Sequence, residues 1–293
     1  MKSLPVKSLL LFSTSLLSAN LFAATNSITP DDIMRFESLN KPVISDNGKT
    51  LAVEVEPDRG DSHGFVKSLI ANKQFNVAGG TKPKISHDGR FVAFIDAVPL
   101  LDLEKASKKA KKKLKSGLIL LDTNTGLETR YERVKSFEFN ETGSHLAIWF
   151  EADEKKKDEK SADEAKSSKS AVKVDDFDKG TLVELVDLKS NKSIKFNDVT
   201  GFNFDKSGLH LALAINNIEA NKHELRLVNL ANNTAKIVKS FKQQQLGSLA
   251  LSHDGKYLGF TSGNANELPY GREYQLSLLN LETNKLIAAP TSC

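Results

Sequence analysis

A short phrase recurs five times along this chain of 293 residues. Each copy has an apolar residue, a polar turn that ends in glycine, and a short apolar run. The copies begin at Ile44, Ile85, Phe139, Phe204 and Leu251. Self-similarity at intervals of about 40 to 65 residues is typical of repeat architectures, and short strands in each repeat predict a β-propeller. We therefore expect an all-β fold with one repetitive body.

The glycine of the phrase occupies the same place in every copy. Glycine adopts a positive φ at little cost, and a tight turn between two strands often requires that conformation. We therefore predict structural turns at Gly48, Gly89, Gly143, Gly208 and Gly255. The apolar runs that follow, such as 91–94 and 211–213, are rich in strand formers and predict buried strands.

A second phrase follows each of the later copies and consists of a strand, a polar residue and a second turn. The polar residues at the strand ends are Asp122, Asp187, Asn229 and Asn280. Four residues later come the types that best tolerate a left-handed conformation, namely Gly126, Asn191, Asn233 and Asn284. Each repeat thus predicts two hairpins, or four strands, which make one propeller blade.

The spacing predicts five blades with one smooth and one decorated face. The expected blades are 41–80, 81–133, 134–199, 200–245 and 246–293. The longest stretches fall between second and third strands, where we expect a lysine-rich loop at 103–116 and a charged insert at 151–180. In a four-stranded meander these stretches all leave from the face opposite the first and third turns. Connections between blades are short, as at 79–84 and 197–201.

The N-terminus predicts export. Residues 1–24 combine a basic start, an apolar and serine-rich run, and a cleavage site after Ala23 or Ala24, which is the pattern of a secretory signal peptide. The run is too short for a stable membrane span, and no cysteine follows it for lipid attachment. We expect a periplasmic or extracellular protein without a membrane anchor after cleavage. Residues 25–40 predict a short helical lead-in, with Thr29 as its cap and Pro30 in its first turn.

Charge and cysteine content exclude several classes of function. The single cysteine, Cys293, allows no internal disulfide and no cysteine-based metal site. The formal net charge is +4, but the seven lysines of 105–115 have no aromatic residue or arginine among them. This run predicts a solvated, partly helical loop and no nucleic-acid partner. The insert at 151–180 mixes both charges and is nearly devoid of apolar residues, which predicts disorder.

The chain lacks the patterns that announce catalysis or metal binding. No G-x-S-x-G is present, and the six histidines form no H-x-x-x-H or H-E-x-x-H pattern. His87 and His253 lie in the repeated turns, where a polar residue needs no further explanation. Residues 122–126 resemble the start of a calcium loop, but no bidentate Glu follows at the right distance. We therefore predict no catalytic residue, no cofactor and no metal site.

The order of these features resembles a known family. The lead-in T-P-D-D-I-M-R-F-E-S-L at 29–39, P-D-R-G-D at 57–61, the lysine-rich 103–117 and E-R-V-K-S-F at 132–137 are similar to the prolyl oligopeptidase family of serine peptidases. The match is closest to its large exported bacterial members and covers only their N-terminal propeller. The resemblance implies a propeller that gates and orients peptide substrates for a C-terminal α/β-hydrolase domain. This chain stops before such a domain, so no catalytic Ser, Asp or His is carried over.

Two interpretations follow from the sequence. In the first, the chain is the non-catalytic propeller of such a peptidase, with a peptide substrate and a missing α/β-hydrolase domain as its partners. The family's propeller usually has more than five blades, so the chain is then the front of a larger one. In the alternative, the chain is a self-sufficient exported propeller that closes with five blades and binds a protein or peptide. The sequence leaves open the partner and the face that docks another domain.

Overall fold

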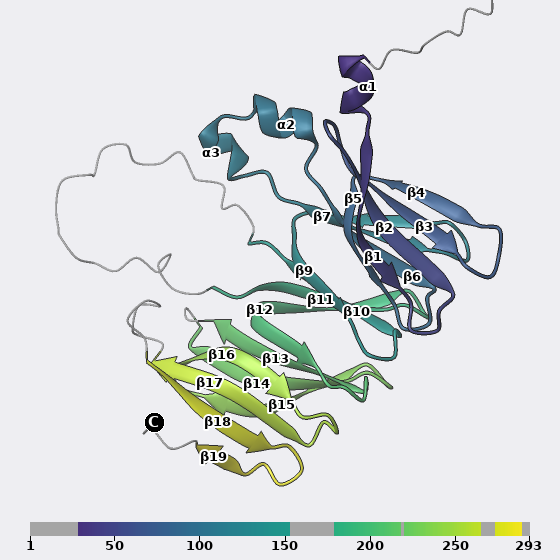
Figure 1. The fold of residues 1–293 in the computed structure, drawn as a ribbon. Coiled ribbons are helices and arrows are strands. Elements are labelled where there is room, and N and C mark those ends of the chain that lie inside the picture. Colours follow the sequence, from purple (N-terminus) through teal and green to yellow (C-terminus); the bar gives the residue numbers. More distant parts are fainter. Residues whose placement is uncertain (1–28, 153–178, 218–219, 265–272, 289–293) are drawn as a thin grey trace, which may run out of the picture.

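A computed structural model describes residues 29–152, 179–217, 220–264 and 273–288. Its strands form antiparallel sheets that stack side by side along an open arc (Figure 1). The predicted all-β propeller of four-stranded blades, with about five blades present, is confirmed. The predicted signal peptide (1–24) and most of the charged insert (151–180) lie outside the described residues.

Blades 1 and 2 are separate four-stranded meanders. Blade 1 consists of β1 (Glu37–Ile44), β2 (Thr50–Pro57), β3 (His63–Ser68) and β4 (Gln74–Ala78). Blade 2 consists of β5 (Gly80–Ile85), β6 (Phe91–Asp96), β7 (Gly117–Asp122) and β8 (Glu128–Tyr131). Strand β1 pairs with β2 from Glu37 onward. Blade 1 therefore begins within the stretch that the sequence suggested as a lead-in.

Blades 3 and 4 share one long strand. Their strands are β9 (Val134–Phe139), β10 (His145–Phe150), β11 (Thr181–Asp187), β12 (Lys192–Phe204), β13 (His210–Asn217), β14 (Lys222–Asn229) and β15 (Thr234–Phe241). Strand β12 pairs first with β11 and then with β13, and its partner changes at Val199. We expected a connection at 197–201. Instead a single positive φ of 59° at Asp198 bends the strand, which stays paired on both sides.

Blade 5 lies at the opposite end of the arc from blade 1 (Figure 1). It consists of β16 (Gln244–Leu251), β17 (Tyr257–Asn264), β18 (Tyr274–Asn280) and β19 (Leu286–Ala288). Each buried core cluster among the described residues joins neighbouring blades, and none joins blade 5 to blade 1. The described blades therefore form an open arc (Figure 1) and not the closed five-bladed ring that the alternative interpretation requires.

The core lies between neighbouring blades. Alternate residues of the middle strands point to opposite faces of a sheet, so each of blades 2, 3 and 4 contributes to two interfaces. Between blades 1 and 2, the Phe94 ring is fully buried among Val66, Ile119 and their neighbours. A Cβ on Gly64 would lie 2.3 Å from this ring, so only glycine leaves room for it. The interface between the two blades is thus fixed by the large side chain of Phe94, which packs against a glycine.

Three short helices lie outside the blades. Helix α1 (Pro30–Met34) precedes blade 1 and is capped by Thr29, whose hydroxyl accepts a hydrogen bond from the Asp32 amide at 3.2 Å. Helices α2 (Leu100–Lys105) and α3 (Lys108–Lys111) lie between β6 and β7, in the predicted lysine-rich loop. None of the helices in the described residues is both long and apolar enough to cross a membrane.

Phe94→Ala should lower the free energy of unfolding by about 3–5 kcal/mol, because it removes a fully buried ring and leaves a cavity between two blades. Phe36→Ala is the matched control. That ring is 53% exposed, and its loss should change the free energy by less than about 0.5 kcal/mol. Urea unfolding followed by tryptophan fluorescence measures both. Equal effects of the two substitutions would contradict the placement of the core.

Candidate functional site

The turn between the first and second strands is built in the same way in all five blades. A side-chain oxygen at its first polar position accepts a hydrogen bond from the amide five residues later, at 2.9 to 3.0 Å. The pairs are Ser45 with Thr50, Ser86 with Phe91, Asn140 with His145, Asp205 with His210, and Ser252 with Tyr257. The bond closes each turn and satisfies an amide at the point where the second strand begins.

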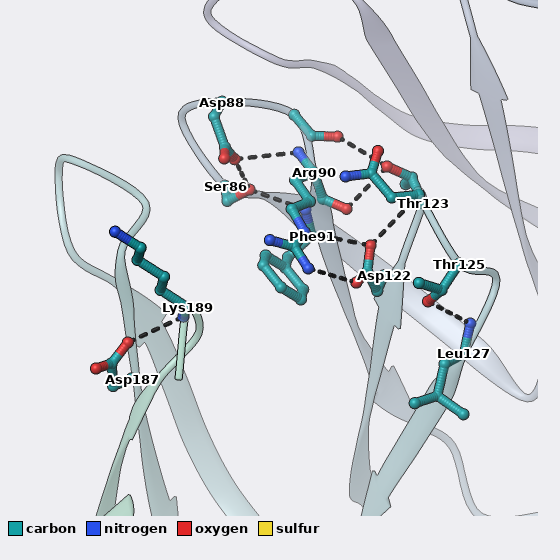
Figure 2. A network of polar contacts seen from close by, with 12 residues as sticks. Ser86, Asp88, Arg90, Phe91, Asp122, Thr123, Thr125, Leu127, Asp187 and Lys189 are labelled. Carbon is teal, nitrogen blue, oxygen red and sulfur yellow. Dashed lines mark hydrogen bonds and ion pairs between the residues drawn. The ribbon is translucent and has the colours of Figure 1, made fainter. Parts of the chain in front are cut away.

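Figure 2 shows this arrangement in blade 2. The Ser86 hydroxyl donates to the Asp88 carboxylate at 2.7 Å and accepts from the Phe91 amide at 3.0 Å. The same Asp88 oxygen accepts from the Arg90 amide at 3.1 Å. Blades 1 and 5 repeat the pattern with Asn47 and Asp254 in place of Asp88. The polar side chains of the repeated phrase in these blades therefore form hydrogen bonds within their own turns.

The repeated glycines have a second role that the sequence did not reveal. All five have φ between +67° and +74°, in the left-handed region. Four of them also lie against the turn of the preceding blade. These contacts are Gly89 on Ser45 and Thr50, Gly143 on Ser86 and His87, Gly208 on Thr142, and Gly255 on Asp205 and His210. Gly48 in blade 1 has no comparable contact, because a Cβ there would meet nothing within 4 Å.

An ion pair joins the first and third turns of blade 2. Arg90 Nη2 lies 2.9 Å from Asp122 Oδ2, and the guanidinium covers the Phe91 ring (Figure 2). Burial on its own would raise the pKa of Asp122, but the hydrogen bonds from Arg90 and the Asn124 amide outweigh it and hold the pKa below its ordinary value. The carboxylate that suggested a calcium loop is thus occupied by protein donors.

The turn of blade 4 brings together serine, aspartate and histidine. Asp205 is buried, and its carboxylate accepts from Ser207 Oγ at 2.6 Å and lies 2.9 Å from His210 Nδ1. A serine nucleophile needs the imidazole as its hydrogen-bond partner, but here the hydroxyl is bonded to the carboxylate instead. Burial would raise the pKa of Asp205, yet the bonds from Ser207 and from the His210 amide and ring lower it overall. The cluster is arranged as a structural turn.

Three further histidines also bond to protein groups. His87 Nδ1 lies 2.7 Å from Asp46 of the preceding blade, and His145 Nε2 lies 3.0 Å from Asn233 Oδ1 of the next one. His223 is buried and lies 3.1 Å from Asn216. Within the described part of the chain, no group of three or more His, Cys, Asp or Glu side chains is placed to hold a metal ion.

A groove lies on the opposite face, between blades 1 and 2. Its volume is about 390 Å³, and it lies beneath the first turn of α2. Val98, Pro99, Leu100 and Leu103 form an apolar wall, and Asp61, Asp96 and Arg130 supply the charged groups. Arg130 Nη1 pairs with Asp96 at 3.0 Å, while Nη2 donates to the Ala78 carbonyl at 3.1 Å. Sequence reasoning missed this groove, because its residues come from four separate loops and strands.

The helix over the groove is attached by few contacts. Asp61 accepts a hydrogen bond from the Leu100 amide at 2.7 Å, and Arg59 pairs with Glu104 at 2.9 Å on an exposed surface. No residue of α2 is buried. Such an element has little apolar area to hold it down, so it opens more readily than the blades beneath it.

Comparison with known proteins supports the fold. An initiation factor described as eukaryotic has a TM-score of 0.52 at 12% identity, over 87% of this chain and 56% of that one. The fold is a β-propeller. The propeller domain of the Trilobed protease from Pyrococcus furiosus has a TM-score of 0.42 at 14% identity, over 87% and 71% of the two chains. An acylaminoacyl peptidase from Pyrococcus horikoshii has a TM-score of 0.43 at 11% identity, over 87% and 40%.

No family model and no curated protein matches the chain. The chain spans 56% of the initiation factor and 40% of the acylaminoacyl peptidase. At these identities the similarity establishes the propeller fold alone.

Gly143→Ala should destabilise the protein more than Gly48→Ala. Both substitutions place a Cβ at a positive φ, which costs about 1–2 kcal/mol. At Gly143 the new atom also lies 2.9 Å from the His87 amide nitrogen of the preceding blade, which adds about 1–3 kcal/mol of overpacking. Urea unfolding of the two variants measures the difference. Equal losses would show that the contact between turns contributes nothing.

Asp205→Asn should remove part of the stability at neutral pH but little of it in acid. Blade 3 carries Asn140 at the equivalent position, so the amide bond to residue 210 is retained. The expected loss at pH 7 is about 1–3 kcal/mol, from hydrogen bonds to a charged acceptor. Because the pKa of Asp205 is lowered on folding, this stability is present above the unfolded pKa of about 4 and disappears as pH falls through the folded one. Thermal unfolding between pH 2 and pH 7 tests this, and a difference independent of pH would contradict it.

Proposed function

We propose that this chain is the non-catalytic propeller of an exported peptidase of the prolyl oligopeptidase type, in which it gates and orients peptide substrates. The supporting observation is the groove between blades 1 and 2. It offers an apolar wall beside a few fixed polar groups, which is the composition of sites that hold small ligands and peptides. The sequence resemblance supplies the substrate class.

The groove suits an extended peptide. Side chains of an extended segment alternate, so one set would face Val98 and Leu103 while the other stays in solvent. Asp96 and Arg130 hold each other in place at 3.0 Å and present fixed charges to the peptide backbone or its ends. A site whose charges are already paired keeps its shape without a ligand. This lowers the entropic cost of ordering its side chains when a peptide binds.

Helix α2 provides the gate in this proposal. Its exposed ion pair between Arg59 and Glu104 contributes little to stability, so the helix moves without disturbing the blades. An opening of α2 would uncover the groove, and its return would close the groove over a bound peptide. In keeping with the predicted signal peptide, we place this activity in the periplasm or outside the cell.

Leu103→Glu should weaken peptide binding about tenfold or more, because it places a charge in the apolar wall of the groove. The probe is a short fluorescein-labelled peptide with alternating apolar residues, and the readout is fluorescence anisotropy. Leu127→Glu is the control, since Leu127 is 66% exposed and follows a tight turn of the opposite face. Failure of the unmodified chain to bind such peptides, or equal binding by both variants, would contradict the proposal.

A further inference from the structure

A second cavity lies on the tight-turn face, between blades 1 and 2, and has a volume of about 320 Å³. Blade 1 contributes the end of its first turn and its third turn, and blade 2 contributes the same two turns. The groove beneath α2 lies on the opposite face, and the two sites share no lining residue. This cavity is thus a separate site, formed where two neighbouring blades meet.

Hydrogen bonds between the two blades hold the cavity walls in place. Thr50 Oγ1 donates to the Gly89 carbonyl at 2.8 Å. Lys73 Nζ donates to the Asn124 carbonyl at 3.2 Å. Both bonds join a turn of blade 1 to a turn of blade 2, so the cavity is already formed without a ligand. A preformed site lowers the cost of ordering side chains on binding.

Cationic side chains outnumber carboxylates around the cavity. Lys49, Lys73 and Arg90 line it, and Asp88 is the one carboxylate among its described lining residues. Arg90 is already paired with Asp122 at 2.9 Å. Lys49 and Lys73 are exposed, and neither forms an ion pair within the described part of the chain. Two ammonium groups thus have donors available for an anion.

An apolar wall lies beside these ammonium groups. Val66, Ile70 and Phe75 line the cavity from blade 1, and Ile70 is 71% exposed. In every blade the amide of the preceding residue donates to the first turn, so the five third turns can be aligned. The residues equivalent to Ile70 are all polar or small, namely Asn124, Lys189, Ala231 and Glu282. The turn itself therefore does not require an isoleucine at this position.

We propose that this cavity binds a carboxylate that carries an aliphatic group, and that the source of this carboxylate is the C-terminus of a peptide. The carboxylate accepts hydrogen bonds from Lys49 and Lys73, and such charge-assisted bonds are stronger than neutral ones. The aliphatic side chain covers Ile70 and is removed from water. The volume is at the lower end of the range for ligand sites, which suits one terminal residue.

Asp88 favours a peptide end over a simple fatty acid. Its Oδ1 accepts hydrogen bonds from Ser86 Oγ and the Arg90 amide (Figure 2). Its Oδ2 accepts none from the described residues. The last residue of a peptide brings a carboxylate, a side chain and an amide N–H on one Cα. The amide N–H supplies the donor that Asp88 Oδ2 lacks, and a fatty acid has no such group.

NMR titration of the isotope-labelled chain tests this proposal, with N-acetyl-leucine as the probe. The probe has the carboxylate, the aliphatic side chain and the amide of a peptide end. N-acetyl-leucinamide lacks the charge, N-acetylglycine lacks the side chain, and isocaproate lacks the amide. The readout is the chemical shift of the Gly89 and Ala71 amides, which line the cavity. The Leu103 amide reports on the groove separately, so failure here is distinguishable from failure of the proposed function.

We expect saturable shifts at Gly89 and Ala71, with a dissociation constant for N-acetyl-leucine of about 1 mM. Each of the other three compounds should bind about fivefold more weakly or not at all. Shifts that do not saturate, or equal binding of N-acetyl-leucinamide or N-acetylglycine, would overturn the proposal. Equal binding of isocaproate would overturn the peptide end as the source of the carboxylate.

Two variants test the residues that form the site. Lys49→Gln removes one ammonium group, and Ile70→Asn introduces the residue that blade 2 has at the equivalent position. Lys256→Gln is the matched control, because Lys256 occupies the place of Lys49 in blade 5 and its side chain is 53% exposed. The first two should weaken binding of N-acetyl-leucine about fivefold, and the control should leave it unchanged. All three residues are exposed, so circular dichroism should show that the variants fold. Equal binding by Lys49→Gln and Lys256→Gln would overturn the proposal.

Discussion

Blades 2 to 5 are each positioned on the blade before them by a turn whose glycine has no room for a side chain. At Gly143 the backbone comes so close to the His87 amide that a Cβ would lie 2.9 Å away. The same turn is closed from within by a side-chain acceptor, Asn140, bonded to the His145 amide at 2.9 Å. Because the turn is rigid and its glycine fits the neighbouring turn, the angle between blades is set at the rim as well as in the core.

The two faces of the arc differ in how firmly their residues are held. The polar residues of the tight-turn face, including the Ser207, Asp205 and His210 cluster, are engaged in closing turns. The opposite face has the groove and a helix attached mainly through Asp61 and an exposed ion pair. A rigid face thus supports a more adaptable one, in keeping with the greater mobility of loops that rest on a regular scaffold.

Much of the fold could be predicted from local sequence. The glycine after a polar turn residue, followed by runs such as 211–213, defines a hairpin by backbone conformation alone, and four hairpin strands define a blade. The contact of Gly143 with the preceding blade could not be predicted, because it joins residues more than fifty positions apart. The same holds for the groove, whose Asp61 and Arg130 are far apart in sequence. The continuous β12 was missed because Asp198, a residue typical of turns, here bends a strand without ending it.

Stacking of one blade's turn on the turn of the next blade should protect the backbone amides of both turns from hydrogen exchange. Native-state hydrogen exchange of the five equivalent turn amides tests it most directly, because each is bonded to the same kind of side-chain acceptor. At a protein concentration where the chain is monomeric, the amides of Phe91, His145 and His210, whose turns have a blade on either side, should exchange most slowly. The Tyr257 amide, in the turn that receives no glycine from the described residues, should exchange faster. Equal protection of Tyr257 and His145 would show that each turn is stable by itself and would contradict the account.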